Sequence, residues 1–122
     1  MALSITELLS DEEGQPYLDK SEVRLRVSNN DLMGDMAKIS EATKCKLVVF
    51  VEFPAGFKSG KRVPDQDQLA VVLSGSLRIS APENEETLLG PGGIFRLPQA
   101  ASSTHTLEAI GPEAVRLMVL QA

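Results

Sequence analysis

The sequence predicts a single all-β domain, a barrel or sandwich of short strands, with one short helix ahead of it. From residue 22 onward, apolar and polar residues alternate with a period of two, which indicates half-buried strands. Glycine and proline interrupt this pattern at regular intervals, as they do in the turns of antiparallel β proteins. The length of 122 residues suits one core and leaves no room for a second domain.

The helix is predicted from the N-terminal segment. Ser4 and Glu7 have the spacing of a capping box, in which each side chain accepts a hydrogen bond from the other residue's backbone N–H. A helix over residues 4–12 has its apolar side chains on one face and ends before Gly14, because glycine commonly closes helices. We therefore expect a short amphipathic helix that covers part of the β domain.

The remaining chain is divided by its turn residues. We expect residues 1–21 to form the helix and a lead-in segment, and residues 22–122 to form the β domain. Gly75 interrupts the longest β run, and a glycine in that setting marks a bulge or a corner. The strands expected in this domain are, in order, residues 22–27, 46–53, 68–80, 87–89, 93–97, 104–109 and 114–120.

Composition restricts the partners and the compartment. The formal net charge of −5 repels nucleic acid and anionic lipid surfaces, so neither is an expected partner. The single cysteine, Cys45, excludes an intramolecular disulfide and a multi-thiolate zinc site, as suits a reducing compartment. The N-terminus has no signal-peptide pattern, and no apolar run approaches the length of a membrane span. We expect a cytoplasmic protein.

Two segments carry a family resemblance. In residues 56–75, glycines stand at both ends and six residues separate Gln68 from Gly75. In residues 92–113, a glycine and a proline precede His105, and a Gly-Pro-Glu turn follows it. With this layout, a little over half of the chain resembles the cupins. The resemblance implies a single-domain jelly-roll barrel with one pocket, and a homodimer, because small cupins commonly associate through their sheets.

The resemblance also shows what is missing. Metal-binding cupins hold a divalent ion with a His-x-His pair and a glutamate from the first motif and a histidine from the second. Gln68 stands at the glutamate position, and His105 is the only histidine in the chain. The histidine pair is replaced, depending on loop length, by Arg62 and Pro64 or by Lys61 and Val63. We therefore predict no metal site and no cofactor.

Four residues are the candidate ligand-binding set: Arg62, Gln68, Ser103 and His105. Gln68 and His105 occupy ligand positions of the two motifs, so they are expected to face each other across one pocket. Ser103 shares the strand face of His105, and Arg62 favours a carboxylate if it points inward. His105 is also the only candidate general base, although a hydrogen-bonded, inert histidine is an open alternative.

Three functions remain open. The first is a metal-free cupin that binds a small neutral or anionic molecule. The second is an enzyme, either an isomerase or epimerase that uses His105 as a base, or a metal-dependent dioxygenase with unusual ligands. The third is a structural or interaction module whose barrel is filled by its own side chains. A shared cupin fold does not decide among them, because one fold supports many activities.

Overall fold

A computed structural model describes residues 3–27, 38–60, 66–82, 85–99 and 104–122. Within these residues the chain is all-β, and none of them is helical. The strands are β1 (Ser4–Ser10), β2 (Pro16–Glu22), β3 (Arg26–Val27), β4 (Lys38–Ile39), β5 (Leu47–Phe53), β6 (Gln68–Ser74), β7 (Ser76–Ala81), β8 (Glu85–Leu89), β9 (Ile94–Leu97), β10 (Thr106–Ile110) and β11 (Val115–Gln121). The predicted all-β class is confirmed.

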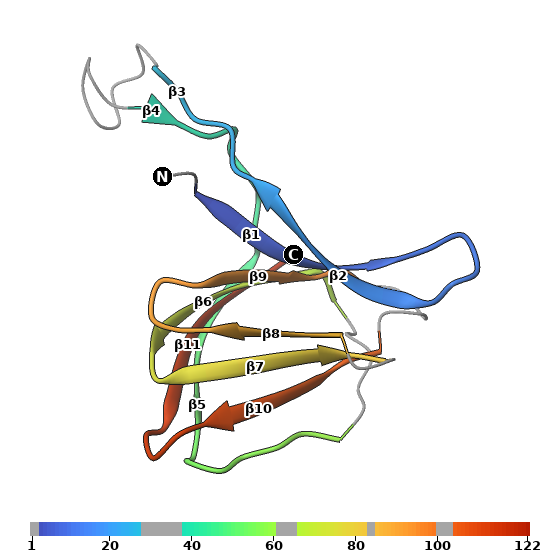
Figure 1. Ribbon diagram of the computed structural model, residues 1–122. Helices are drawn as coiled ribbons and strands as arrows, with labels where there is room; N and C mark the ends of the chain where they lie inside the picture. The colour runs from blue at the N-terminus through green and yellow to red at the C-terminus, as the bar shows by residue number, and fades with distance from the viewer. Residues whose placement is uncertain (1–2, 28–37, 61–65, 83–84, 100–103) are drawn as a thin grey trace.

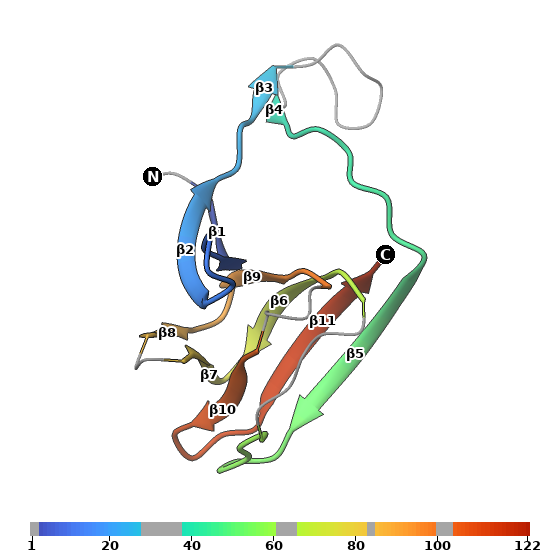
Figure 2. The ribbon, with the colours of Figure 1, turned by 90° about the vertical axis from the view of Figure 1, so that its right-hand side faces the viewer.

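The strands form two facing sheets (Figure 1). One sheet has six strands in the order β2-β1-β9-β6-β11-β5, and the other has three in the order β10-β7-β8. The described strands thus make a jelly roll of two separate sheets, and no closed barrel is formed. A third, two-stranded ribbon of β3 and β4 projects away from both sheets (Figures 1 and 2).

The predicted N-terminal helix is wrong, because residues 4–10 form strand β1. This strand pairs antiparallel with β2 along its whole length and parallel with β9 on its other side. In strand geometry Ile5 and Leu8 point to opposite faces, and both are buried. Glu7 bonds to Arg96 of β9 and has no capping role. Two-sided pairing and burial outweigh the local helix signal.

A tight turn joins β1 to β2. Oδ1 of Asp11 accepts hydrogen bonds from the backbone N–H groups of Glu13 and Gln15, each at 2.9 Å. The N–H of Gly14 donates to the carbonyl oxygen of Asp11 at 3.0 Å, and Gly14 has a φ of 81°. Glycine adopts this left-handed conformation without steric cost, so it closes a hairpin here and not a helix.

Most of the other strands lie where the periodicity placed them. The long β run is divided at Gly75 into β6 in the large sheet and β7 in the small sheet, so the predicted corner is confirmed. The strand predicted over residues 22–27 is reduced to β3, since β2 already ends at Glu22. The turn expected at residues 29–31 lies outside the described residues.

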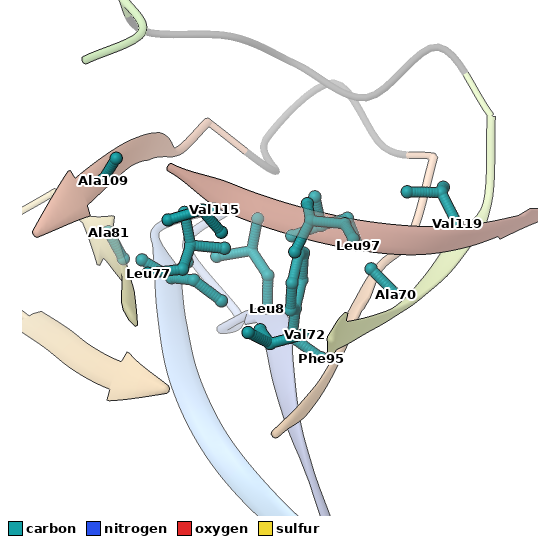
Figure 3. Packing of buried hydrophobic residues seen from close by; sticks show 12 residues of the cluster. Leu8, Ala70, Val72, Leu77, Ala81, Phe95, Leu97, Ala109, Val115 and Val119 are labelled. Carbon is teal, nitrogen blue, oxygen red and sulfur yellow. The ribbon is translucent and has the colours of Figure 1, made fainter. Parts of the chain in front are cut away.

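The interface between the two sheets is apolar (Figure 3). Leu8, Leu77 and Val115 are completely buried and come from three different strands. The core cluster is completed by Ala70, Val72, Ile79, Ala81, Phe95, Leu97, Ala109, Leu117 and Val119. Only one of these side chains is aromatic, so the core is aliphatic, as expected for a chain without tryptophan.

The segment after β5 continues the small sheet. The N–H of Ser59 donates to the carbonyl oxygen of Leu107, and the N–H of Ala109 donates to that of Phe57. Phe57 also stacks on Phe53, with ring centroids 4.5 Å apart. The sequence here indicates a loop or an irregular edge, and the segment lies along β10 as a short strand-like edge. The described residues contain no helix with the length and apolar character of a membrane span.

Candidate functional site

The two family-motif residues lie at the same end of the jelly roll. Gln68 begins β6, and the chain turns at Gly75 and returns through β7 to Ala81. The start of β6 and the end of β7 are therefore at one end of the molecule. His105 immediately precedes Thr106, which pairs with Ser80 near the end of β7. We call this end, with Gln68 and His105, the polar end.

Both side chains belong to the inward faces of their sheets. Gln68 lies on the same face of β6 as the core residues Ala70 and Val72, and it pairs with the buried Leu97. His105 is two residues before Leu107, which packs against the core, and only 5% of its surface is exposed. Gln68 is half-buried. Strand alternation and burial thus place an imidazole and an amide at the margin of an apolar interior.

The other two predicted ligand residues are Arg62 and Ser103, and both lie outside the described residues. Lys61, which belongs to the same basic cluster, also lies outside them. Lys58 is described and is exposed, and its backbone pairs with Glu108 of β10. The side chain of Lys58 therefore lies in solvent.

The described residues do not provide the donors of a divalent metal site. Among them, no three His, Cys, Asp or Glu side chains are grouped closely enough to hold an ion. The two motif positions that are described offer one imidazole and one neutral amide. A divalent ion of the cupin type needs imidazoles and a carboxylate, so this donor set does not fit it.

Ser59 was missed by sequence reasoning. It is one of the buried polar residues of the described chain, and its Oγ accepts a hydrogen bond of 2.9 Å from the backbone N–H of Leu107. The hydroxyl thereby ties the segment after β5 to the strand that follows His105. No periodic or motif signal in the polar segment around Ser59 predicts this contact, which depends on tertiary pairing.

A second feature lies on the opposite side of the six-stranded sheet. Residues 23–27 and 38–46 form an arm that carries β3 and β4 and rises over this sheet (Figure 2). Between the arm and the sheet is a cavity of about 750 Å³, which we call the arm cleft. Its floor consists of side chains from β1, β6 and β9, which are Ile5, Leu69, Val71, Ile94 and Arg96.

The arm cleft is separate from the interior between the sheets. Leu69 and Val71 alternate along β6 with core residues, and Ile94 alternates along β9 with Phe95. The floor of the arm cleft is therefore the outer face of the six-stranded sheet. Ile5 is buried, yet it is not a member of the core cluster, as expected for a side chain beneath the arm. The sequence suggested a pocket at the polar end only.

The outer wall of the arm cleft mixes apolar and charged side chains. The apolar ones include Val23 and Ile39, and the charged ones are Arg24, Arg26, Glu22 and Glu41. In the sequence, this wall corresponds to the alternating segment that was expected to form a half-buried strand. Val23 and Val27 line the cavity, but Arg24 and Arg26 line it too. Leu25 and Val27 are exposed, so the expected half-buried apolar face is not formed.

Comparisons with known proteins find the fold and no sequence family. No family model and no curated protein matches the chain. A cupin domain from Schizosaccharomyces pombe is similar over 100% of this chain and 82% of its own, with a TM-score of 0.54 and 19% identity. An RmlC-like cupin family protein from Methanocaldococcus jannaschii covers 62% of this chain and 67% of its own, with a TM-score of 0.52 and 16% identity.

The Drosophila melanogaster CENP-C cupin domain is also similar, over 70% of this chain and 67% of its own, with a TM-score of 0.52 and 11% identity. These proteins share an architecture with this chain at identities that carry no information on function. The chain therefore has the cupin fold.

Proposed function

We propose that this protein binds a small neutral or anionic molecule at the polar end, without a metal. The observation that carries the proposal is the position of His105, a buried imidazole on an inward face, at the same end as Gln68. An imidazole and an amide at the margin of an apolar interior give a small polar molecule groups to bind. Binding is the activity that these two side chains support.

The two side chains complement each other chemically. The amide of Gln68 both donates and accepts hydrogen bonds, and His105 offers two ring nitrogens whose roles depend on the tautomer. A carboxylate or hydroxyl group of a small molecule satisfies both. Arg62, which lies outside the described residues, remains a predicted contributor that would favour an anion.

The single histidine makes the test direct. A ¹H–¹³C correlation spectrum contains one imidazole Cε1 signal, because His105 is the only histidine. We expect this signal to shift saturably when one of a panel of probes is added, with acetate, succinate, pyruvate and glucose as the first members. Native mass spectrometry of protein purified from cells should show a bound small molecule. No shift with any probe, together with no co-purified mass, would refute the proposal.

Variants locate the binding. For a probe that shifts the signal, His105→Ala and Gln68→Ala should each weaken binding by about 1–3 kcal/mol, the cost of leaving a polar partner unsatisfied. Thr106→Ala is the matched control, because Thr106 is adjacent in sequence and lies on the outward face of the same strand. Equal losses in all three variants would show that the pocket is elsewhere. Turnover of a bound probe that depends on His105 would favour the enzyme alternative.

A second candidate function is self-association, and strand β5 is the observation that favours it. This strand is an edge of the six-stranded sheet, and four successive residues, Leu47, Val48, Val49 and Phe50, are exposed on it. Natural edge strands are usually protected by charges, prolines or bulges. A run of exposed apolar side chains on an edge strand is typical of an interaction surface.

A second copy of the chain is the occupant that this edge fits. Two copies of one edge strand pair antiparallel about a twofold axis, and the backbone groups are then self-complementary. Pairing centred on Phe50 places Lys46 of one copy diagonally opposite Glu52 of the other, which are opposite charges on one face. We therefore propose a homodimer through β5.

A further inference from the structure

We propose that the arm cleft is a second binding site, which accepts an amphipathic carboxylate with an aliphatic chain. The proposal does not depend on the polar end, because the arm cleft lies on the outer face of the six-stranded sheet. Its volume of about 750 Å³ is within the usual range of small-molecule pockets. Three features of its lining select the ligand class.

The first feature is the apolar floor. Leu69, Val71 and Ile94 are half-buried on adjacent strands, and Ile94 pairs directly with Val71. Val23 and Ile39 face them from the arm. Of the described residues that line this cavity, none is aromatic and none has an amide side chain. Such a surface gains stability by contact with an aliphatic chain and offers little to a sugar or a nucleotide.

The second feature is a guanidinium held in position on that floor. Nη1 of Arg96 donates to Oε1 of Glu7 at 2.9 Å, and the same oxygen accepts a hydrogen bond of 2.8 Å from Oγ of Ser21. An arginine has five N–H donors, so this contact leaves others available to a ligand. Arg96 is thus oriented before any ligand binds, which lowers the entropy cost of binding.

The third contribution comes from the arm. Arg24 and Arg26 also line the arm cleft, and among the described residues neither forms an ion pair. Two carboxylates, Glu22 and Glu41, line it as well. Because Glu7 pairs with Arg96, the cleft has no excess of positive charge, and the selection of an anion depends on the placement of the guanidinium groups. Guanidinium groups match a carboxylate by paired hydrogen bonds, whereas the aliphatic floor takes the chain.

The test uses decanoate as the probe and isothermal titration calorimetry as the readout, on the full chain. We expect saturable binding with one site per chain, with affinity rising from octanoate to decanoate as more methylene groups are buried. Decanol, which has the same chain and no charge, should bind at least about tenfold more weakly. Equal affinity for decanol and decanoate, or no saturable binding, would overturn the proposal.

Variants place the probe in the arm cleft. Arg96→Gln and the double variant Arg24→Gln/Arg26→Gln should each lose about tenfold or more in decanoate affinity, and Arg96→Lys should lose less than Arg96→Gln because it keeps the charge. Arg116→Gln is the matched control, since Arg116 is an exposed arginine of the same sheet that pairs with Glu52. A loss in the control equal to that of the cleft variants would overturn the assignment.

Two further variants separate this site from the polar end and from unfolding. Ile94→Asp should abolish decanoate binding while the melting temperature remains close to that of the parent, because Ile94 is outside the core cluster. His105→Ala should leave decanoate affinity unchanged, even though it weakens any ligand of the polar end. Decanoate binding that survives Ile94→Asp, or that is lost in His105→Ala, would contradict the arm cleft as the site.

Discussion

At the scale of single residues, Gly75 shows how a backbone position directs the fold. It joins β6 of the large sheet to β7 of the small sheet, with a φ of 80°. A Cβ atom built at this position would lie 2.5 Å from the carbonyl oxygen of Ala114 and 3.0 Å from Cα of Val115. Both the conformation and the close approach of β11 therefore require glycine.

Gly75→Ala should destabilise the protein by more than Gly56→Ala. Gly56 has nearly the same φ, 79°, but no atom lies within 4 Å of its added Cβ. Gly56→Ala is the control, and it should lower the free energy of unfolding only by the conformational cost of about 1–2 kcal/mol. Gly75→Ala adds an overlap with backbone atoms, and we expect a total loss of about 3 kcal/mol or more in urea unfolding. Equal losses would mean that β11 moves aside without cost.

At the scale of elements, the β1–β2 hairpin shows how pairing overrides a local signal. Ser4 and Glu7 have the spacing of a capping box. However, their strand, β1, lies between β2 and β9 in the sheet and has backbone partners on both sides. Leu8 enters the core and Ile5 enters the arm cleft, so both faces of the strand bury an apolar side chain. If this segment formed a helix, one of these two side chains would lose its burial, and β9 would become an edge strand of the sheet.

The turn of this hairpin makes a testable prediction. Asp11→Ala removes an acceptor of two backbone hydrogen bonds, from Glu13 and Gln15, and should cost about 1 kcal/mol because the turn is exposed. Asp11→Asn keeps a side-chain oxygen and should recover most of the loss. Glu12→Ala, at the exposed neighbouring position, is the control and should change little. Thermal unfolding of the three variants measures the three stability losses. A loss in Glu12→Ala as large as that in Asp11→Ala would contradict the prediction.

At the scale of the whole molecule, the six-stranded sheet has apolar surface on both faces. Its inner face is covered by the small sheet (Figure 1), and part of its outer face is the floor of the arm cleft. Around β5, Phe50 is 73% exposed and pairs with Met118 on the same outer face. This uncovered area is where the proposed homodimer would bury further surface.

Phe50→Lys should convert the dimer to a monomer, because a charge on the edge strand disfavours strand pairing between copies. We expect sedimentation equilibrium to give about twice the 13.1 kDa chain mass for the parent and one chain mass for this variant. Leu88→Lys is the control, since Leu88 is 59% exposed on β8 in the other sheet. A monomeric parent, or dissociation in the control as well, would contradict association through β5.

Much of the strand pattern could be predicted because it depends on short-range alternation. The strands on either side of Gly75, the edge strand from Leu47 to Phe53 and the closing strand all follow from a period of two between turn residues. The positions of Gln68 and His105 followed from motif spacing together with that alternation. Their direct opposition across a pocket stays a prediction, as do the contributions of Arg62 and Ser103.

The sequence by itself determined the all-β class, the aliphatic core and the corner at Gly75, because each depends on composition or on residues a few positions apart. Only the tertiary structure decided that β1 is a strand, since its partner β9 lies about ninety residues further along the chain. It also decided the Arg96–Glu7 contact and the arm cleft, which bring together residues 5, 24 and 94. Contacts between segments so far apart leave no periodic signal in the sequence, because their geometry is set by how the sheets and the arm pack.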